Sequence, residues 1–359
     1  MTTSLKQRLR STLLELFTFN ELYPDEKAVI DYTIKRLAEH GYQCELDSFR
    51  NIIVRLEGVG EPVLLSTHLD IPEAAPNVQF TEEGDIIRSM GSSILGVDPK
   101  TGLAILIEFL INEAAKSTND RLPVEVLLTR GEETGLFGAR NADYHLLQAK
   151  TGLVLDEDGP VTQVVVRAPA FVRFDAEFQG KIVHPREPEN GINALQAACA
   201  AMQSIPWGYS TPGVTWNIGL LSSGTARNSV PGSVKLKAEL RSYDTALAVS
   251  EGERIATAYA REAEKIGAKC VIDKELEFEG YKLDQDHPLF TRLEKTFATM
   301  NLKPNYFETF GGSDANIFNA KGIRCVPIGS GYYNAHQYTE YADLGVMEEI
   351  TRFLETFIR

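Results

Sequence analysis

The sequence is poor in several features that would assign it to a class of protein. Its four cysteines, Cys44, Cys199, Cys270 and Cys325, lie far apart and form no C-x-x-C pair. This spacing argues against a disulfide framework or a cysteine-ligated zinc site and favours a cytoplasmic protein with reduced thiols. No apolar run approaches the roughly 20 residues that span a bilayer, so no membrane partner is expected. Internal repeats and low-complexity segments are also absent.

Positive charge is scarce as well. The 359 residues include 36 Lys and Arg against 50 Asp and Glu, which gives a formal net charge of -14. A general nucleic-acid binder needs a basic surface, so nucleic acid is not an expected partner. The first segment, MTTSLKQRLRSTLLELF, has charges within its apolar stretch and no small-residue cleavage site. It predicts an amphipathic helix and not a signal peptide.

The order of helix-like and strand-like segments predicts two domains. In residues 1–164, helical patterns alternate with apolar runs such as PVLLSTHLD, which predicts an α/β fold with a doubly wound, mostly parallel sheet. Residues 165–277 have the order βαββαβ, typical of a small ferredoxin-like α+β domain. A helix and strand of the first type return in 278–359. The sequence therefore predicts a catalytic domain of 1–164 plus 278–359, with a lid domain of 165–277 inserted into it.

Histidines and carboxylates recur at or just beyond the apolar runs. They are His68, Asp70, Asp98, Glu132, Glu133, Asp156 and His336. Because sites in an open parallel sheet form at the carboxyl ends of strands, these side chains are expected to meet at one edge. Their mixed nitrogen and oxygen donors suit two divalent ions of the zinc type with one carboxylate between them; cobalt and manganese also fit. The pattern predicts a hydrolase that activates water on a metal pair.

The first members of this set have simpler explanations. A single histidine after a strand is more often a surface or hydrogen-bonded residue. In extended backbone, however, Asp70 shares a face with His68 and can hold its second ring nitrogen. An adjacent glutamate pair usually marks a solvated turn, but Glu132 and Glu133 directly follow a buried-type strand and have flanking glycines. Neighbouring residues point in different directions, so one can bind metal while the other faces substrate.

The remaining members are less distinctive locally. Asp98 precedes Pro99 and a helical run, which fits a helix N-cap as well as a ligand. Asp156 competes with Asp158 in LDEDG and is preferred because it lies nearer the strand. His336 has no motif of its own and depends on the rest of the set.

Eight segments in order resemble the dizinc exopeptidase family that includes peptidase T, aminoacylase and glutamate carboxypeptidase. The resemblance is strongest to the peptidase T-like branch and covers nearly the whole chain. The segments are STHLD, GSSILGVDPKTG, GEETGLFGA, LDEDG, GKIVHPREPENGINAL, GTARNSVPG, AELRSYD and GGSDANIFNAKG. A related dizinc aminopeptidase family inserts its extra domain between the first histidine and the bridging aspartate. Here that stretch, between His68 and Asp98, is too short for a domain.

The resemblance implies a role for each matching residue. Asp98 would bridge two metal ions, with His68 and Asp156 completing one site and Glu133 and His336 the other. Asp70 would orient His68, and Glu132 would act as general base and general acid. Family members commonly carry an acidic residue after the bridging aspartate, joined by a cis peptide. A cis bond before proline costs only about 0.5–1 kcal/mol, so a cis Asp98–Pro99 bond is predicted.

Three residues of the lid domain also match the family. His184, Asn228 and Arg241 align with positions that contact substrate; His184 would stabilise an oxyanion and Arg241 would hold a substrate carboxylate. The simpler alternatives are a solvated loop histidine and an arginine paired with a structural carboxylate. The family also implies a possible homodimer through the lid domain, with His184 acting in its own site or in a partner's site.

Three functions remain open at this point. The first is a metal-dependent exopeptidase that hydrolyses small peptides, in the manner of an aminotripeptidase. The second keeps the chemistry but acts on N-acyl amino acids, as a deacylase or carboxypeptidase. The third is a catalytically silent peptide-binding relative, although none of the expected ligands is lost. A phosphate or dinucleotide site has little support, because the required glycine spacings are missing.

Overall fold

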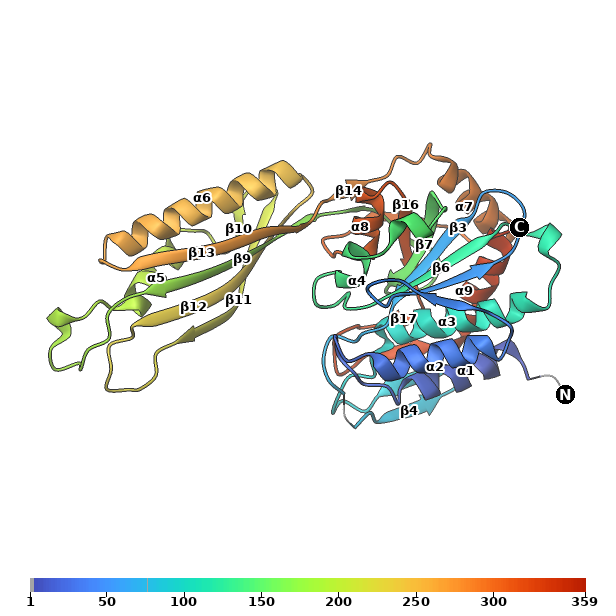
Figure 1. Ribbon diagram of the computed structural model, residues 1–359, viewed down its shortest axis with the longest axis horizontal. Coiled ribbons are helices and arrows are strands. Elements are labelled where there is room, and N and C mark those ends of the chain that lie inside the picture. The colour runs from blue at the N-terminus through green and yellow to red at the C-terminus, as the bar shows by residue number, and fades with distance from the viewer. Residues whose placement is uncertain (1–2, 76) are drawn as a thin grey trace. The chain divides into compact units, whose positions relative to one another are not determined.

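The protein forms two compact units (Figure 1). This computed structural model describes residues 3–75 and 77–359. The larger unit comprises Met1–Val166, Leu283–Glu308 and Ser313–Arg359, and the smaller comprises Arg167–Lys282 and Thr309–Gly312. The smaller unit therefore interrupts the larger one in the sequence. The limits 1–164, 165–277 and 278–359 stay a prediction.

The main sheet is mixed α/β in character and parallel at its centre. Its strand order is β1-β2-β6-β3-β7-β16-β8-β14, with β15 also paired to β8. The central strands β6, β3, β7 and β16 are mutually parallel, whereas β1, β2, β8 and β14 pair in antiparallel fashion. The bounds are β1 Cys44–Leu46, β2 Ile52–Leu56, β3 Val63–His68, β6 Val124–Thr129, β7 Thr151–Glu157, β8 Gln163–Ala168, β14 Tyr281–Lys282, β15 Asn305–Glu308 and β16 Arg324–Gly329.

Helices cover both faces of this sheet (Figure 1). Helix α3 packs against β2, β3 and β7 and is covered in turn by α1, α2 and α9, while α4 and α8 pack near β6 and β16. Strand β3 is consequently buried along its whole length, as its continuous apolar run requires. The bounds are α1 Leu5–Leu16, α2 Lys27–Ala38, α3 Val97–Ala114, α4 Phe137–Arg140, α7 Pro288–Thr299, α8 Asp314–Ala320 and α9 Leu344–Phe357.

A small four-stranded antiparallel sheet lies outside the predicted elements. Its order is β17-β18-β5-β4, with β4 Phe80–Glu83, β5 Ile86–Ser89, β17 Tyr332–Tyr333 and β18 Tyr341–Asp343. The hairpin turns at Gly84, which has φ 61°. These strands are too short to give a clear alternating pattern, and one of their three pairings, β18 with β5, joins residues more than 200 positions apart. The sheet brings the segment after β16 beside β5.

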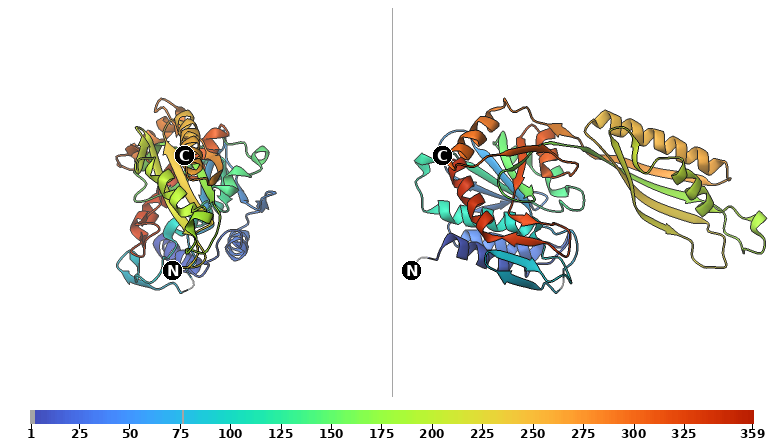
Figure 2. Two further views of the ribbon diagram at one scale, coloured as in Figure 1. Left: turned by 90° about the vertical axis from the view of Figure 1, so that its left-hand side faces the viewer. Right: turned by 180° about the vertical axis from the view of Figure 1, so that it is seen from behind.

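The smaller unit is a ferredoxin-like α+β fold (Figure 2). Its antiparallel sheet has the order β10-β11-β12-β9-β13, with α5 and α6 packed on it. The short strand β10 is an addition to the predicted βαββαβ order. At the core, Phe174, Trp216 and Tyr259 meet edge to face, with ring centroids 5.3–6.1 Å apart. The bounds are β9 Ala170–Gln179, α5 Ala194–Gln203, β10 Gly208–Thr211, β11 Val214–Ser223, β12 Ser233–Ser242, α6 Thr245–Glu264 and β13 Lys269–Phe278.

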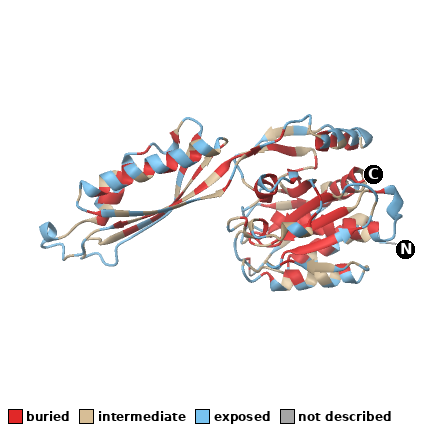
Figure 3. Cartoon of the chain, turned by 45° about the horizontal axis from the view of Figure 1, so that its top comes forward, coloured by how far each residue is buried: buried red, intermediate tan, exposed pale blue. Residues whose placement is uncertain are grey.

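Burial follows the expected patterns (Figure 3). Strand β9 alternates buried and half-buried residues, because one face of its sheet packs on the helices. Helix α6 buries one stripe that includes Ala248, Ile255 and Tyr259. Within residues 3–75 and 77–359, no helix has the length and apolarity needed to cross a membrane.

Candidate functional site

The parallel strands deliver four of the predicted ligand segments to one edge of the main sheet. His68 is the last residue of β3, and Asp156 lies near the end of β7, the next strand in the sheet. Glu132 and Glu133 follow β6, the other neighbour of β3. His336 lies beyond the end of β16. The carboxyl ends of parallel neighbours share an edge, so the sheet itself brings these residues together.

Asp98, at the start of α3, lies at the same edge of the main sheet. Its backbone is extended, with φ -87° and ψ 112°, and the Asp98–Pro99 bond is cis, as predicted. Its Oδ1 lies 2.9 Å from Nε2 of His68, and its Oδ2 lies 3.3 Å from Nε2 of His336. The carboxylate therefore stands between the two histidines and gives one oxygen to each.

The ligand atoms form overlapping groups, two of which share Asp98. One group is His68, Asp98 and Asp156; a second is Asp98, Glu133 and His336; a third joins His68 to Glu132 and Glu133. In each group, the donor atoms lie within 4.8 Å of one another. Two nitrogen and oxygen donor sets with a common carboxylate are the arrangement expected for two neighbouring divalent ions. The residues present therefore fit a metal pair.

Asp70 links His68 to the glutamate loop. Nδ1 of His68 lies 3.1 Å from the Asp70 carbonyl oxygen and 3.3 Å from its Oδ1. The same carboxylate accepts the backbone N–H of Glu132 at 2.9 Å and that of Glu133 at 3.1 Å. Asp70 is fully buried. Asp70 thus contacts both the histidine and the turn that carries the two glutamates, and its spacing from His68 did not predict the second contact.

Burial and mutual repulsion raise the pKa of three carboxyl groups in the cluster. Burial, with the charge of Asp98, raises the pKa of Asp156 to about 6. Burial also raises the pKa of Glu133 to about 7, and burial with the charge of Asp156 raises the pKa of Glu132 well above its usual range. These carboxylates are costly to ionise together without cations, so this electrostatic setting also fits bound metal.

For Asp98 and the two histidines, by contrast, hydrogen bonds favour the charged form. Burial opposes ionisation of Asp98, but hydrogen bonds from His336 and His68 outweigh it and hold the pKa of Asp98 below its usual range. Burial likewise disfavours the charged form of His68, yet hydrogen bonds to Asp156, Asp70 and Asp98 raise its pKa. Hydrogen bonds to Asp98 and Glu133 raise the pKa of His336 to about 10.

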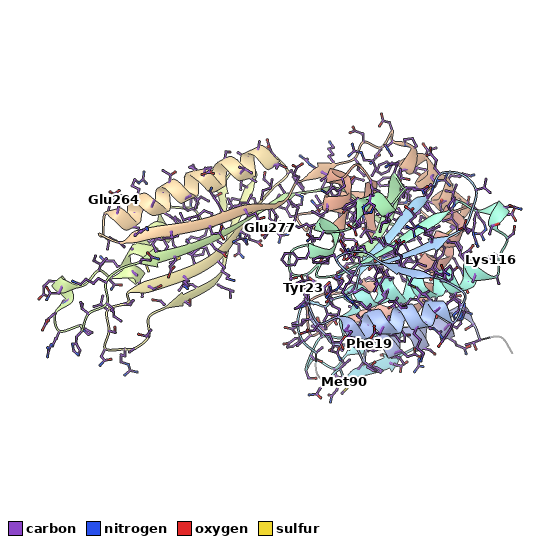
Figure 4. All side chains as sticks on the ribbon, in the orientation of Figure 1. Phe19, Tyr23, Met90, Lys116, Glu264 and Glu277 are labelled. Atoms are coloured by element: carbon purple, nitrogen blue, oxygen red, sulfur yellow. The ribbon has the colours of Figure 1, made fainter. Side chains whose placement is uncertain are left out.

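Residues near the start of the chain contact the loop that carries Glu132 and Glu133. The buried Glu26 carboxylate accepts the N–H of Gly131 at 3.1 Å and pairs with Arg130 at 2.6 Å. Tyr23, labelled in Figure 4, stacks on Phe137 with ring centroids 5.3 Å apart. Gly131 has φ 60°, and a Cβ there would come within 2.6 Å of the Tyr23 ring. The loop before Glu132 therefore requires glycine.

The three predicted lid residues lie in the smaller unit. His184 is exposed, and its Nδ1 accepts the N–H of Arg186 at 3.2 Å. Asn228 is exposed in the loop between β11 and β12. Arg241 is half-buried, donates to Glu239 at 3.1 Å and to the Phe310 carbonyl at 2.9 Å, and lies over the Phe171 ring. In this conformation, the structure matches the alternative in which Arg241 pairs with a carboxylate of the protein.

Two buried carboxylates beside the cluster have no role predicted from the sequence. Asp314, at the start of α8, is 1% exposed, accepts the Thr129 hydroxyl and has a pKa raised to about 7 by burial. Its motif GGSDANIFNAKG was noted only as part of the family pattern. Glu340 is 1% exposed and contacts the loop before Asp98. No local signal marks Glu340, because its partners lie far away in the sequence.

Comparisons with known proteins agree with this arrangement. A family model described as a peptidase dimerisation domain matches residues 170–268. A tripeptidase structure from Staphylococcus aureus aligns with a TM-score of 0.88 and 26% identity, covering 98% of this chain and 97% of that one. The aminopeptidase PepT structure from Bacillus cereus gives a TM-score of 0.83 and 26% identity, covering 98% of both chains. These similarities support an assignment to the peptidase T-like branch of the exopeptidase family.

A further relative matches the chain over nearly its whole length. The uncharacterised protein YqjE of Bacillus subtilis is 28% identical over 98% of this chain and 97% of its own length. Its name gives no activity. The aligned region spans the sequence of both units.

Proposed function

We propose that the protein is a metal-dependent exopeptidase that hydrolyses small peptides, with an aminotripeptidase-like preference. The observation that carries the proposal is the placement of Asp98, whose two oxygens each face a different histidine within two overlapping ligand groups. The tripeptidase and aminopeptidase names of the two similar structures support the choice of small peptides.

In the proposed metal centre, Asp98 would be shared, His68 and Asp156 would hold one ion, and Glu133 and His336 would hold the other. Zinc suits these donors, as do cobalt and manganese. When bound, such a pair supplies a Lewis acid for the scissile carbonyl and lowers the pKa of water.

The chain's own groups move the proton. The carboxylate of Glu132 takes a proton from the attacking water and later delivers it to the leaving nitrogen, which is general base and acid catalysis. Asp70 supports this role because it fixes the backbone of Glu132 through the N–H contact at 2.9 Å. From the lid, we assign the oxyanion contact to His184, a polar substrate contact to Asn228 and the substrate carboxylate to Arg241. The Arg241 role requires substrate to displace Glu239.

We also propose a homodimer formed through the smaller unit, in the cytoplasm. Strand β10 pairs only with Val214–Trp216 of β11, so in the described residues the stretch from Ile218 onward pairs on one side alone, with β12. Leu220 and Leu221 in that stretch are 64% and 47% exposed. An unpaired edge with exposed leucines is suited to pairing with a second copy. Light scattering would test this: a Leu220→Lys, Leu221→Lys variant should be monomeric, and a monomeric wild type would refute the proposal.

The test of the activity uses protein loaded with zinc, manganese or cobalt and measures release of free amino acids. Dipeptides, tripeptides and N-acyl amino acids are offered in parallel, with Glu132→Gln as the inactive variant. Glu125→Gln is the matched control, because Glu125 is also buried but accepts the N–H groups of Gln148 and Ala149 away from the cluster. Turnover of tripeptides with a free N-terminus supports the proposal. Turnover of N-acyl compounds alone would assign a deacylase, and tight metal binding without turnover would favour a silent relative.

A further inference from the structure

The loop that precedes Asp98 is held by a single carboxylate oxygen. Oε1 of Glu340 accepts the backbone N–H groups of Leu95, of Gly96 at 2.7 Å and of Val97 at 3.4 Å. Gly96 is in the left-handed region with φ 71°. Successive N–H groups around such a residue point into one concavity that binds an anion. Here the anion is a side chain of the protein, located 245 residues from Leu95 in the sequence.

Glu340 belongs to the segment that carries His336. The segment closes on itself: the N–H of Glu340 donates to the Gln337 carbonyl at 3.0 Å, and that of Gln337 donates to the Asn334 carbonyl at 3.2 Å. The Glu340 carbonyl accepts the Ser89 N–H at 3.0 Å, which ties the segment to β5. The turn around His336 is therefore one compact piece, and its Glu340 end is attached to the loop of Asp98.

The turn around His336 and the loop before Asp98 both depend on contacts that fix their backbone. His336 has φ 63°, a left-handed conformation that costs a non-glycine residue free energy and persists only when its surroundings impose it. On the other loop, the buried Lys100 ammonium donates to the Leu95 carbonyl at 2.9 Å and to Asn20 at 3.2 Å. Lys100 and Glu340 thus hold neighbouring peptide groups of the same loop. By contrast, His68 and Asp156 lie on strands β3 and β7, whose position is set by the main sheet.

We propose that Glu340 is a positioning residue that couples the bridging Asp98 to His336 and so sets the metal affinity of the Asp98–Glu133–His336 group. The inference rests on the proposed metal pair. The effect is asymmetric. Removing the Glu340 charge lowers the affinity for the ion held by His336 more than the affinity for the ion held by His68 and Asp156. A role in folding alone would give no such asymmetry.

The test measures zinc binding to the full chain by equilibrium dialysis against buffered zinc, with elemental analysis of the bound metal. Wild type should bind two ions per chain. Glu340→Gln keeps the shape of the side chain but loses the charge that strengthens the three hydrogen bonds. The zinc affinity of one of the two binding steps should therefore fall by about 10- to 100-fold, as for other groups that orient metal ligands. Glu125→Gln, which removes the charge of another buried carboxylate holding backbone N–H groups, should leave both steps unchanged.

A double variant localises the effect. In a His336→Asn background the weaker step is already lost, so adding Glu340→Gln should change the remaining step by less than about twofold, the non-additivity expected of coupled residues. If Glu340→Gln folds poorly, Glu340→Asp keeps the charge but withdraws the oxygen by one methylene, and it should show the same selective loss. Unchanged binding in both Glu340 variants, or an equal loss of both steps, would overturn the inference. A wild type that binds fewer than two ions would overturn the proposed metal pair and this inference with it.

Discussion

The two sides of the ligand cluster are built in different ways. His68 and Asp156 project from adjacent parallel strands, and their side chains are 1% and 9% exposed. His336 lies on a turn seven residues beyond β16, and its side chain is 49% exposed. The sheet sets the geometry of the strand side, His68 and Asp156, whereas the geometry of the turn side, His336, depends on contacts such as those of Glu340. The candidate metal site therefore combines a half set by the sheet with a half that individual side chains must position.

The largest expected effect comes from the residue that belongs to both sides. Asp98→Asn removes one anionic donor oxygen from the shared carboxylate, so both ions should bind weakly and peptide turnover should fall below detection, a loss greater than about 10⁴-fold and beyond the usual range for a single proton-transfer group. Dialysis and a turnover assay check this. A variant that keeps one tightly bound ion would show that Asp98 serves one side only.

Glu132→Gln should separate chemistry from metal binding. The amide cannot accept the proton, so kcat should fall by about 10²–10⁴-fold. Glu132 is outside the two groups that share Asp98, so the zinc content should stay near that of wild type. Elemental analysis beside the turnover assay makes the distinction. Loss of an ion together with activity would move Glu132 into the ligand set, and Glu125→Gln controls for the loss of a buried charge.

Asp70→Asn should have a smaller effect that reaches both sides at once. The asparagine amide retains one oxygen but can no longer serve His68 and both glutamate N–H groups with a full carboxylate. Metal affinity or kcat should fall by about 10- to 100-fold, as for other groups that orient metal ligands. Zinc titration and initial rates would measure it. A change confined to the His68 side would mean that the contacts to Glu132 and Glu133 contribute little.

The contrast between the two sides also explains what could be predicted from the sequence. His68, Glu132, Glu133 and Asp156 follow recognisable apolar strands, and parallel strands bring their ends together, so their meeting is predictable. The family resemblance, together with the proline after Asp98, made the cis bond predictable too.

The supporting contacts could not be predicted in the same way. The link from Glu340 to Leu95 spans 245 residues and depends on the packing of the small β17-β18-β5-β4 sheet, whose strands are two to four residues long. The dual role of Asp70 depends on the separation of β3 from the β6 loop, and no spacing within STHLD encodes that separation. Patterns along the chain specify elements and their ends, whereas contacts between irregular loops arise from the assembled fold.

The smallest expected effect is a difference in stability between two histidine variants of the metal-free protein. His68→Asn removes a buried ring that contacts Asp70, Asp98 and Asp156, and buried polar groups left without a partner cost about 1–3 kcal/mol. His336 is half exposed, so water can replace part of what His336→Asn removes, and its loss should be the smaller one. Thermal unfolding in chelator measures both.

This comparison isolates the protein's contribution from that of the metal, because the chelator removes the ions from both variants. If the strand side is built into the fold, the unfolding temperature should fall further for His68→Asn than for His336→Asn, by about 2–4 °C for each kcal/mol in a unit of this size. Equal falls would mean that the turn around His336 is as firmly part of the folded structure as the strand ends. In that case the rigid and the supported halves would differ in the origin of their contacts and not in their stability.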